Sequence, residues 1–449
     1  MSELLTQTEA RVREAAAMAV DLAARSGAQA RASAHHEGVA KIVMRGGEIE
    51  TAERSGMQGL SLTVFHDGKQ GSASTSAFDK PAIERVVAEA LLIAEHVRAD
   101  ADAIMPASDL LAYSSPSPKI FETSPRSPDF LLDAAQTIDR TAGEIARTDS
   151  RLRTGECAAV GSEGLWALAT SDGFCRSVKR SNDARWSVFL AQDGDNSLSA
   201  FCQSQERMVE DLLPADVLTR RAANRALQAL NARPVASQRC PVLFDPRTAA
   251  GLVAEFASAL TGQAQYRKMS FLAEPLGRQI AASHLQLEED PFEPLGLASA
   301  GFDSEGIAGS KRAIVRDGIV EGLFLSTFTG RKLAMPSTGN ADGFYNLRLA
   351  SSAAGGDWQA MLDRLGTGLV VTEIQGGKTD PASGNWTHAV KGLWVENGSV
   401  AHAVSDVTLA STMPSMLRGI LAVGDDVERQ GAIRNGSILI DEMQVGGRA

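Results

Sequence analysis

Cysteine is scarce in this sequence, and its placement excludes two common kinds of site. The 449 residues contain four cysteines, Cys157, Cys175, Cys202 and Cys240. No two of them form a C-x-x-C pair, so their spacing argues against a zinc knuckle and against a redox-active dithiol. We expect four reduced and mostly buried thiols, as in a protein of the bacterial cytoplasm.

Long apolar runs and an excess of basic residues are also missing. No segment approaches the roughly 20 consecutive apolar residues that span a bilayer. The first 27 residues lack the apolar centre of a signal peptide, because Glu, Arg and Asp interrupt them. The net charge is −11, whereas nucleic acids and anionic membranes attract proteins with a basic face. The sequence therefore predicts a cytoplasmic protein with neither a nucleic acid nor a membrane as its partner.

The length and the pattern of elements indicate an α+β fold in two domains. A single core stops growing near about 250–300 residues, so a chain of 449 residues favours two cores. The N-terminal domain, 1–232, opens with a helix to about Ala24, and alternating apolar segments then predict a mixed or antiparallel sheet. The stretch NARPVASQRC marks the junction. The C-terminal domain, 233–449, is predicted to be dominated by antiparallel strands.

Short motifs predict where several elements begin and end. Hairpin turns are predicted at Gly46-Gly47, Asp67-Gly68, Asp317-Gly318 and Asn397-Gly398. Helix caps are predicted at Asp79, Ser127 and Asp245. Proline and serine are dense in residues 106–128, which we expect to cross the surface without regular structure. The sequence gives this segment no role.

One carboxylate, Glu255, stands among small and apolar residues in LVAEFASALTG, inside a helix predicted over 246–262. The common zinc-peptidase helix carries two histidines one turn apart and a glutamate beside the first, which takes a proton from metal-bound water. The residues around Glu255 include Ala254 and Ala259, which carry no metal donor. This helix is therefore not predicted to hold a metal.

No other motif identifies a catalytic residue. The sequence has no G-x-S-x-G elbow, and no cysteine has a matching His or Asp context. The seven histidines lack the spacing of a zinc site. A site assembled across strands from His284, His388 and His402 remains open as an alternative.

The segment 375–385 is rich in turn-forming residues, and we expect a glycine-rich loop there rather than an ordinary strand. Two interpretations remain open. A substrate backbone could approach closely at Gly376, Gly377, Asp380, Ser383 and Gly384. Alternatively, the glycines only serve a tight turn that Asp380 caps. The adjacent tryptophans, Trp386 and Trp394, are expected to pack in the core, with contact to a partner or a substrate as the alternative.

In this order and spacing, the motifs resemble those of the TldD/PmbA family. The resemblance includes D-P-x-S-G at 380–384 and the following strand GLWVENG. It extends to VMRGGEIETAERSGMQGLSLTVFHDGKQGSASTS, to FDSEGIAGSKRAIVRDGIVEGLFLSTFTGRKL and to SILIDEMQVGG. Almost the whole chain is covered, and the resemblance implies a protein connected with metal-dependent proteolysis.

Within that family, the metal-bearing branch carries H-E-x-x-x-H on the helix that corresponds to LVAEFASALTG. Here the two histidine positions are Ala254 and Ala259, and only Glu255 is kept. No cysteine follows Cys240 to match the family's additional C-terminal ligand. Although TDPASGN resembles the metal-bearing branch, the missing ligands imply the metal-less branch, called PmbA or TldE.

The resemblance thus implies a non-catalytic subunit of a TldD-type metallopeptidase complex that degrades or processes unfolded peptides. An extended peptide would be held mainly through its backbone. This chain would carry no cofactor, and zinc would be held only by a TldD-like subunit in a heterodimer. Two alternatives remain: an autonomous metal-dependent peptidase with unconventional ligands, and a homodimeric peptide-binding scaffold.

Overall fold

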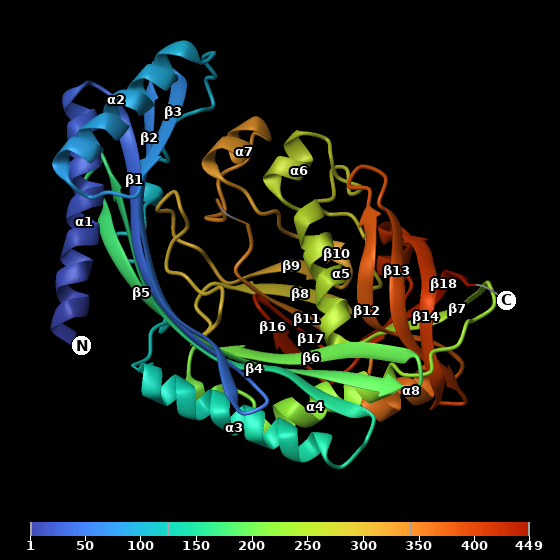
Figure 1. Ribbon diagram of the computed structural model, residues 1–449. Helices are drawn as coiled ribbons and strands as arrows, with labels where there is room; N and C mark the ends of the chain where they lie inside the picture. The colour runs from blue at the N-terminus through green and yellow to red at the C-terminus, as the bar shows by residue number, and fades with distance from the viewer. Residues whose placement is uncertain (1, 124–125, 342, 448–449) are drawn as a thin grey trace.

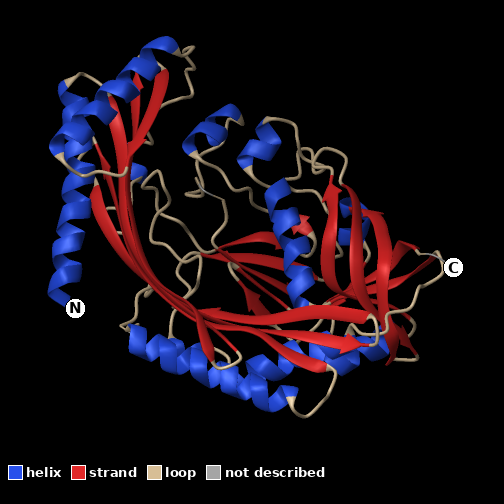
Figure 2. Cartoon of the chain, in the orientation of Figure 1, coloured by secondary structure: helices blue, strands red, loops and turns tan. Residues whose placement is uncertain are grey.

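The computed structural model describes residues 2–123, 126–341 and 343–447, and it shows an α+β fold. The strands gather in three six-stranded sheets. The first sheet is long and curved, and its concave side faces the other two sheets (Figure 1). Figure 2 shows helices at both ends of the curved sheet and a separate helix inside the curve. The predicted fold class is confirmed.

The first sheet is antiparallel throughout and has the order β3-β2-β1-β4-β5-β6. The hairpin turns predicted at Gly46-Gly47 and Asp67-Gly68 are confirmed, because all of these residues have positive φ angles. Glycine and aspartate tolerate this left-handed region better than most residues. The strands are β1 (Gln29–Arg45), β2 (Glu48–His66), β3 (Lys69–Thr75), β4 (Leu152–Thr170), β5 (Cys175–Asp193) and β6 (Asn196–Glu206).

Four helices cover this sheet in two pairs. One pair packs on β1, β2 and β4 through an alanine-rich core, and the other packs on β4, β5 and β6. The predicted caps are confirmed, since Asp79 accepts from the backbone N–H of Ala82 and Ser127 accepts from that of Phe130. The first pair is α1 (Ser2–Arg25) and α2 (Lys80–His96), and the second is α3 (Pro128–Ala146) and α4 (Ala215–Gln228).

A second sheet closes on itself. Its order is β14-β13-β12-β7-β18-β15, and an additional pairing between β14 and β18 completes a ring of five strands, with β15 attached to β18. All of its pairings are antiparallel except that of β7 with β12. The strands are β7 (Gln238–Phe244), β12 (Gly368–Thr379), β13 (Asn385–Glu396), β14 (Ser399–Thr412), β15 (Ile420–Val423) and β18 (Ile438–Gly446).

The third sheet is built from shorter strands in the order β10-β9-β8-β11-β17-β16. These are β8 (Leu285–Asp290), β9 (Arg312–Arg316), β10 (Ile319–Val320), β11 (Asn346–Ser351), β16 (Glu428–Gln430) and β17 (Ile433–Asn435). The helices of this part are α5 (Pro246–Ala259), α6 (Gly262–Tyr266), α7 (Thr327–Lys332), α8 (Trp358–Leu365) and α9 (Met413–Arg418). One apolar core joins α5 to strands of both sheets.

Residues 106–128 are irregular, as predicted, apart from a 3-10 turn over Ser108–Leu110 and the first residue of α3; residues 124–125 lie outside the described part. The expected surface position is wrong for four of them, because Pro106, Leu111, Ala112 and Ile120 are buried. Leu111 and Ile120 are each only 5% exposed. Leu111 pairs with Ile307 of the C-terminal half, and the backbone N–H of Ser181 donates to Ile120. Proline and serine composition predicted the irregular backbone, but these apolar side chains fill a junction that composition does not reveal.

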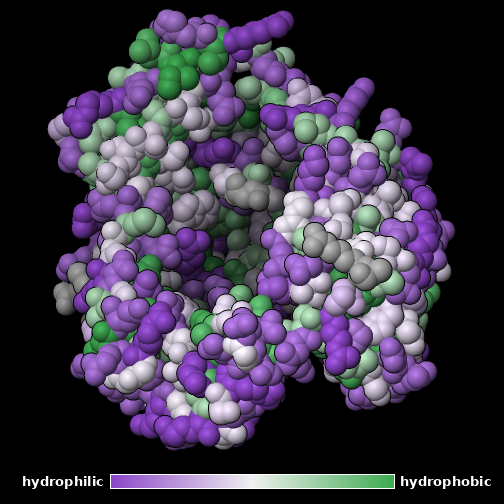
Figure 3. Space-filling model, turned by 45° about the vertical axis from the view of Figure 1, so that its right-hand side comes forward, coloured by the Kyte–Doolittle hydropathy of each residue, from purple (hydrophilic) through white to green (hydrophobic). Residues whose placement is uncertain are grey.

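The strands of the first sheet all precede Arg207, and those of the other two sheets all follow Ser237. The division at residue 232 itself remains a prediction. Within the described ranges, every helix is too short or too polar to cross a bilayer. On one face, the molecular surface is deeply hollowed between the two halves of the molecule (Figure 3).

Candidate functional site

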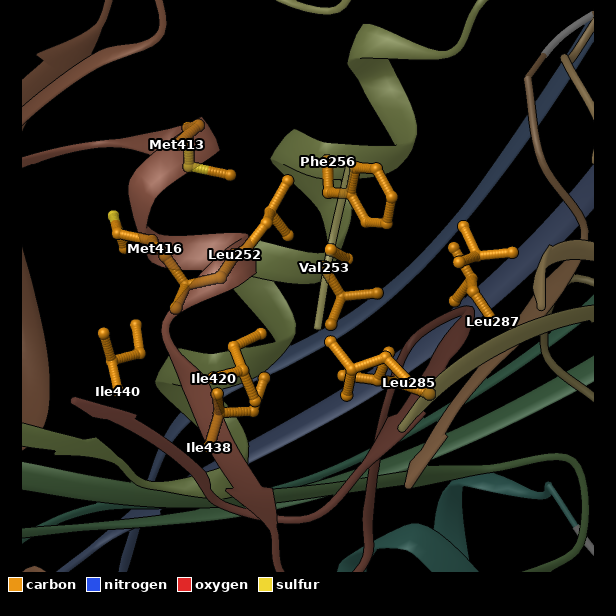
Figure 4. Close-up of a pocket in the computed structure, with 14 residues that line it drawn as sticks. Leu252, Val253, Phe256, Leu285, Leu287, Met413, Met416, Ile420, Ile438 and Ile440 are labelled. Atoms are coloured by element: carbon orange, nitrogen blue, oxygen red, sulfur yellow. The ribbon is translucent and has the colours of Figure 1, made fainter. Parts of the chain in front are cut away.

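Helix α5 is the element on which the predicted site depends. The predicted cap is confirmed: Asp245 Oδ1 accepts from the backbone N–H of Thr248 at 2.7 Å, and Pro246 takes the first helical position. One face of α5 directs Leu252, Val253 and Phe256 into the core (Figure 4). The core contacts therefore fix the rotation of α5, so that the remaining face carries the polar side chain of Glu255.

The cavity drawn in Figure 4 is a gap in this core and not a ligand site. It lies between α5, α9 and strands of both C-terminal sheets, and its volume is about 20 Å³. All of its lining side chains are apolar. An apolar space of this size offers a ligand no hydrogen bond and stays dry.

Glu255 is half-buried and lies in a short polar chain. Thr379 Oγ1, at the end of β12, donates to Glu255 Oε2 at 2.8 Å. His388 Nε2 on β13 lies 3.3 Å from the same hydroxyl. Because a hydroxyl has only one proton to give, the imidazole must donate here while Glu255 is ionised. His388 Nδ1 is then the bare acceptor, and it is buried without a partner among the described residues.

Burial sets the protonation of this group. It raises the pKa of Glu255 above its ordinary value, and the Thr379 hydroxyl acts against that change. The Trp386 indole also lowers the pKa of Glu255, although its nitrogen does not reach hydrogen-bond geometry. Burial lowers the pKa of His388, whose ring lies 4.3 Å from that of Trp386. Both changes favour the uncharged forms.

These donors do not fit a zinc ion. A protein zinc site needs at least three nitrogen, sulfur or oxygen donors around one point. Ala254 and Ala259 supply none, and His388 reaches Glu255 only through Thr379. Over the described ranges, no three His, Cys, Asp or Glu side chains are grouped so that they could hold a metal.

The three histidines of the alternative site lie in different places and contact different residues. His284 uses both ring nitrogens, Nδ1 with Ser351 Oγ and Nε2 with the carbonyl of Ile420, each at 2.8 Å. His402 on β14 lies opposite Trp394 of β13, whereas His388 on β13 lies opposite Leu409 of β14. The described structure therefore does not bring these three imidazoles to one point.

The glycine-rich segment is a hairpin rather than the predicted loop. Residues 375–379 belong to β12, and Gly376 and Gly377 pair with Ala389 and His388 of β13. Gly377 has a φ of 127°, and a Cβ there would lie 2.3 Å from the carbonyl oxygen of Thr387. Glycine is thus required by the irregular pairing of the two strands. The density of turn-forming residues predicted a loop where the chain forms a strand with a glycine at a point of close backbone approach.

The other predicted binding residues form the tight turn of this hairpin. Asp380 Oδ1 accepts from the backbone N–H groups of Ala382 and Ser383, each at 2.9 Å. These bonds lower the pKa of Asp380. Ser383 Oγ accepts from the backbone N–H of Asn385, and Gly384 has a φ of 73°. Each residue has a structural role, and contact with a substrate remains a prediction.

Sequence reasoning missed Thr379 as a partner of Glu255 and considered His388 only as a metal ligand. A signal was present, because Trp386 and His388 are two residues apart and share one face of a strand. Trp386 is fully buried and Trp394 is 8% exposed, which confirms that both pack in the core. The spacing could have placed His388 beside a buried indole, but not beside Glu255, which is 133 residues away.

Comparison with known proteins identifies relatives over the whole chain. Residues 39–94 match the family model described as PmbA/TldA metallopeptidase domain 1, and residues 237–447 match its C-terminal domain. The protein named metalloprotease PmbA in Escherichia coli O157:H7 is 32% identical over 99% of each chain. A homologue named in the same way in Haemophilus influenzae is 30% identical over 99% of this chain and 98% of its own.

Two solved structures share the fold. A protein from Bacteroides thetaiotaomicron has a TM-score of 0.89 at 21% identity, covering 97% of this chain and 98% of its own. TldE from Thermococcus kodakarensis has a TM-score of 0.80 at 17% identity, covering 95% and 99%. Together with the matched models and the sequence relatives, this shows that the chain belongs to the PmbA/TldD family.

Proposed function

We propose that this chain is a non-catalytic, cytoplasmic subunit of a peptidase complex, in which a TldD-like partner holds the zinc and unfolded peptides are the substrate. The observation that carries the proposal is the donor set around α5. Ala254 and Ala259 stand where two imidazoles would be needed, and Glu255 is bonded to Thr379.

The state of Glu255 also supports a structural role. A general base beside metal-bound water must be free to take up a proton. Here one carboxylate oxygen already accepts a hydrogen bond from the Thr379 hydroxyl. Glu255 thus ties α5 to the end of β12 beside the turn at 380–384.

The names of the sequence relatives favour a second candidate, an autonomous metal-dependent peptidase. They are called metalloproteases, and such an activity in this chain would need ligands other than Ala254 and Ala259. A homodimeric peptide-binding scaffold is the third candidate. The three differ in metal content and in partner, so one preparation can separate them.

The first prediction concerns partner and metal together. The tagged chain, purified from its native cell, is expected to bring down a TldD-like protein in about equimolar amount. Zinc, measured by elemental analysis, should follow the amount of that partner. The chain purified alone should hold well under one zinc per molecule and cleave no unfolded peptide.

One tightly held zinc in the lone chain, with peptide hydrolysis that a chelator abolishes, would establish the autonomous enzyme instead. A self-dimer that recovers no TldD-like protein would establish the scaffold.

The second prediction tests Glu255 within the complex. Glu255→Gln should leave the rate of peptide cleavage within about twofold of wild type, because a carboxamide still accepts from Thr379 and no proton transfer is lost. A general base would instead contribute about 10²–10⁴-fold to the rate. Glu144→Gln, at an exposed position of α3, is the matched control. A loss of 100-fold in Glu255→Gln alone contradicts the non-catalytic assignment.

A further inference from the structure

Residues 325–338, which include α7, form an Ω-loop, a compact surface loop whose two ends meet. The backbone N–H of Thr338 donates to the carbonyl of Leu325 at 3.1 Å, and the N–H of Leu325 donates to Thr338 Oγ1 at 2.8 Å. Ser337 Oγ donates to the same carbonyl at 3.1 Å. Because these bonds close the base, the loop between Leu325 and Thr338 can change position while its two ends stay together.

One side of α7 is seated on the C-terminal half. The rings of Phe328 and Tyr266 on α6 meet edge to face, with 5.9 Å between their centroids. Thr329 packs directly on Gly262, where a Cβ would lie 2.6 Å from that of Thr329. The backbone N–H of Thr327 also donates to Glu305 Oε2 at 2.7 Å. These contacts give α7 a defined resting position.

The other side of α7 is held to the N-terminal half by charge. Lys332 Nζ lies 2.7 Å from Asp100 Oδ1 and 2.8 Å from Asp102 Oδ2. Arg331 Nε lies 3.2 Å from Asp102 Oδ1. The Lys332 ammonium also lies over the Phe328 ring, 5.2 Å from its centroid, so it is positioned from within α7. We call Asp100, Asp102, Arg331 and Lys332 the ionic clasp.

The acidic half of the clasp is ordered as well. The backbone N–H of Asp100 donates to the carbonyl of Gly68, in the turn between β2 and β3, at 2.7 Å. The backbone N–H of Asp102 donates to Asp100 Oδ1 at 3.0 Å. The clasp therefore joins α7 to the tip of the first sheet, and Figure 1 shows α7 between that tip and α6.

Ionic strength is the condition to which the clasp is sensitive. Between 20% and 46% of each of its four side chains is exposed, so dissolved ions can screen the charges. The hydrogen bonds of Lys332 lower the pKa of Asp100 and of Asp102, and they raise the pKa of Lys332. The clasp consequently stays charged across neutral pH, where salt rather than pH weakens it.

We propose that the Ω-loop 325–338 is a lid between the two halves of the molecule, which the ionic clasp holds closed and which salt releases. Opening parts α7 from the tip of the first sheet while Leu325 and Thr338 remain bonded. Mobile elements in proteins are those whose opening costs little free energy, and the clasp consists of charges that water already reaches. The lid goes beyond the proposed peptidase partnership and does not depend on it.

Hydrogen exchange, followed by mass spectrometry on the full chain, tests the clasp. Lys332→Gln removes the charge, Lys332→Arg keeps it, and Lys311→Gln removes an exposed ion pair with Asp290 elsewhere in the C-terminal half. In 50 mM NaCl, Lys332→Gln should speed exchange in residues 326–338 about fivefold, and the other two variants should stay within twofold of wild type. Wild type in 1 M NaCl should resemble Lys332→Gln in 50 mM NaCl.

A distance across the clasp shows whether the lid itself moves. Spin labels at Leu92→Cys on α2 and at Ala334→Cys just after α7 occupy exposed positions. Cys175→Ser removes the native thiol that is not fully buried. Double electron–electron resonance should give one narrow distance in 50 mM NaCl. A second, longer distance should appear in 1 M NaCl, and also in 50 mM NaCl once Lys332→Gln is added.

Faster exchange together with the longer distance supports the lid. Unchanged exchange in Lys332→Gln overturns the proposal. Faster exchange without a second distance would show fraying of α7 alone, and faster exchange throughout the first sheet would show a purely structural tie; either result also overturns the lid. So does an equal effect of Lys311→Gln. None of these measurements involves zinc, a peptide or a TldD-like protein, so a failure here leaves the proposed function standing, and the converse also holds.

Discussion

Arg207→Met should lower the free energy of unfolding by about 3–5 kcal/mol, since it leaves buried carbonyl groups without a donor. Arg207 follows the last residue of β6 and is only 5% exposed. It donates to the carbonyls of Ser181 and Leu297 at 2.7 Å, and to that of Gly296 at 3.3 Å. The first carbonyl belongs to β5 and the other two to the C-terminal half. The Arg207 side chain therefore donates hydrogen bonds to both halves of the molecule.

Urea unfolding followed by tryptophan fluorescence measures this effect. Burial lowers the pKa of Arg207 to about 10, so the guanidinium stays charged at neutral pH. The substitution therefore removes a charged donor group. Methionine keeps the apolar stem of the side chain and removes only the donors. Arg85→Met, at an exposed position of α2, should stay within about 0.5 kcal/mol of wild type. If Arg207→Met unfolds within 1 kcal/mol of wild type, these carbonyls do not depend on Arg207.

Asp303→Asn should flatten the dependence of stability on pH. Burial and the neighbouring charge of Glu305 raise the pKa of Asp303 to about 7. Between about pH 4 and pH 7, the folded state therefore binds more protons at this group than the unfolded state does. Stability consequently falls as the pH rises through this window. A rise of about three units corresponds to a fall of at most about 4 kcal/mol.

Asp303 accepts backbone hydrogen bonds that offset this loss of stability at higher pH. Its Oδ1 accepts from the backbone N–H groups of Glu305 and Ile307, and its Oδ2 accepts from that of Ala341. Glu305 in turn lies 3.6 Å from Arg31 on β1. Asparagine keeps one acceptor and does not titrate. The variant should therefore be less stable than wild type near pH 5, and the difference in stability should shrink near pH 8.

Urea midpoints measured from pH 5 to pH 8 check this expectation. Asp133→Asn, at an exposed position of α3, should keep the wild-type profile. Parallel profiles for Asp303→Asn and wild type would show that Asp303 ionises at its ordinary pH.

Local chemistry accounts for the parts of the structure that could be predicted. Asp67-Gly68 and Asn397-Gly398 turn as expected, because these residues accept positive φ angles. Asp245 caps α5 because its carboxylate reaches the backbone N–H of Thr248 within the same turn. In each case, the residues that decide the structure lie within a few positions of one another.

The unpredicted parts depend on contacts between distant segments. Thr379 meets Glu255 across 124 residues, because β12 pairs with β7, which leads directly into α5. The close pairing of Gly377 with β13 is possible because glycine has no Cβ, which would lie 2.3 Å from the carbonyl oxygen of Thr387. Leu111 is buried by a bridge to Ile307. No local pattern in the sequence encodes these pairings.

The ring of five strands has a consequence for the order in which the protein is made. Its closing strand, β18, comes from the last described residues of the chain and joins β7 to β14. During synthesis, the ring must wait for these residues to leave the ribosome, and until then β7 and β14 present open flanks. The N-terminal sheet needs no strand beyond Glu206, so its strands can pair before the ring closes.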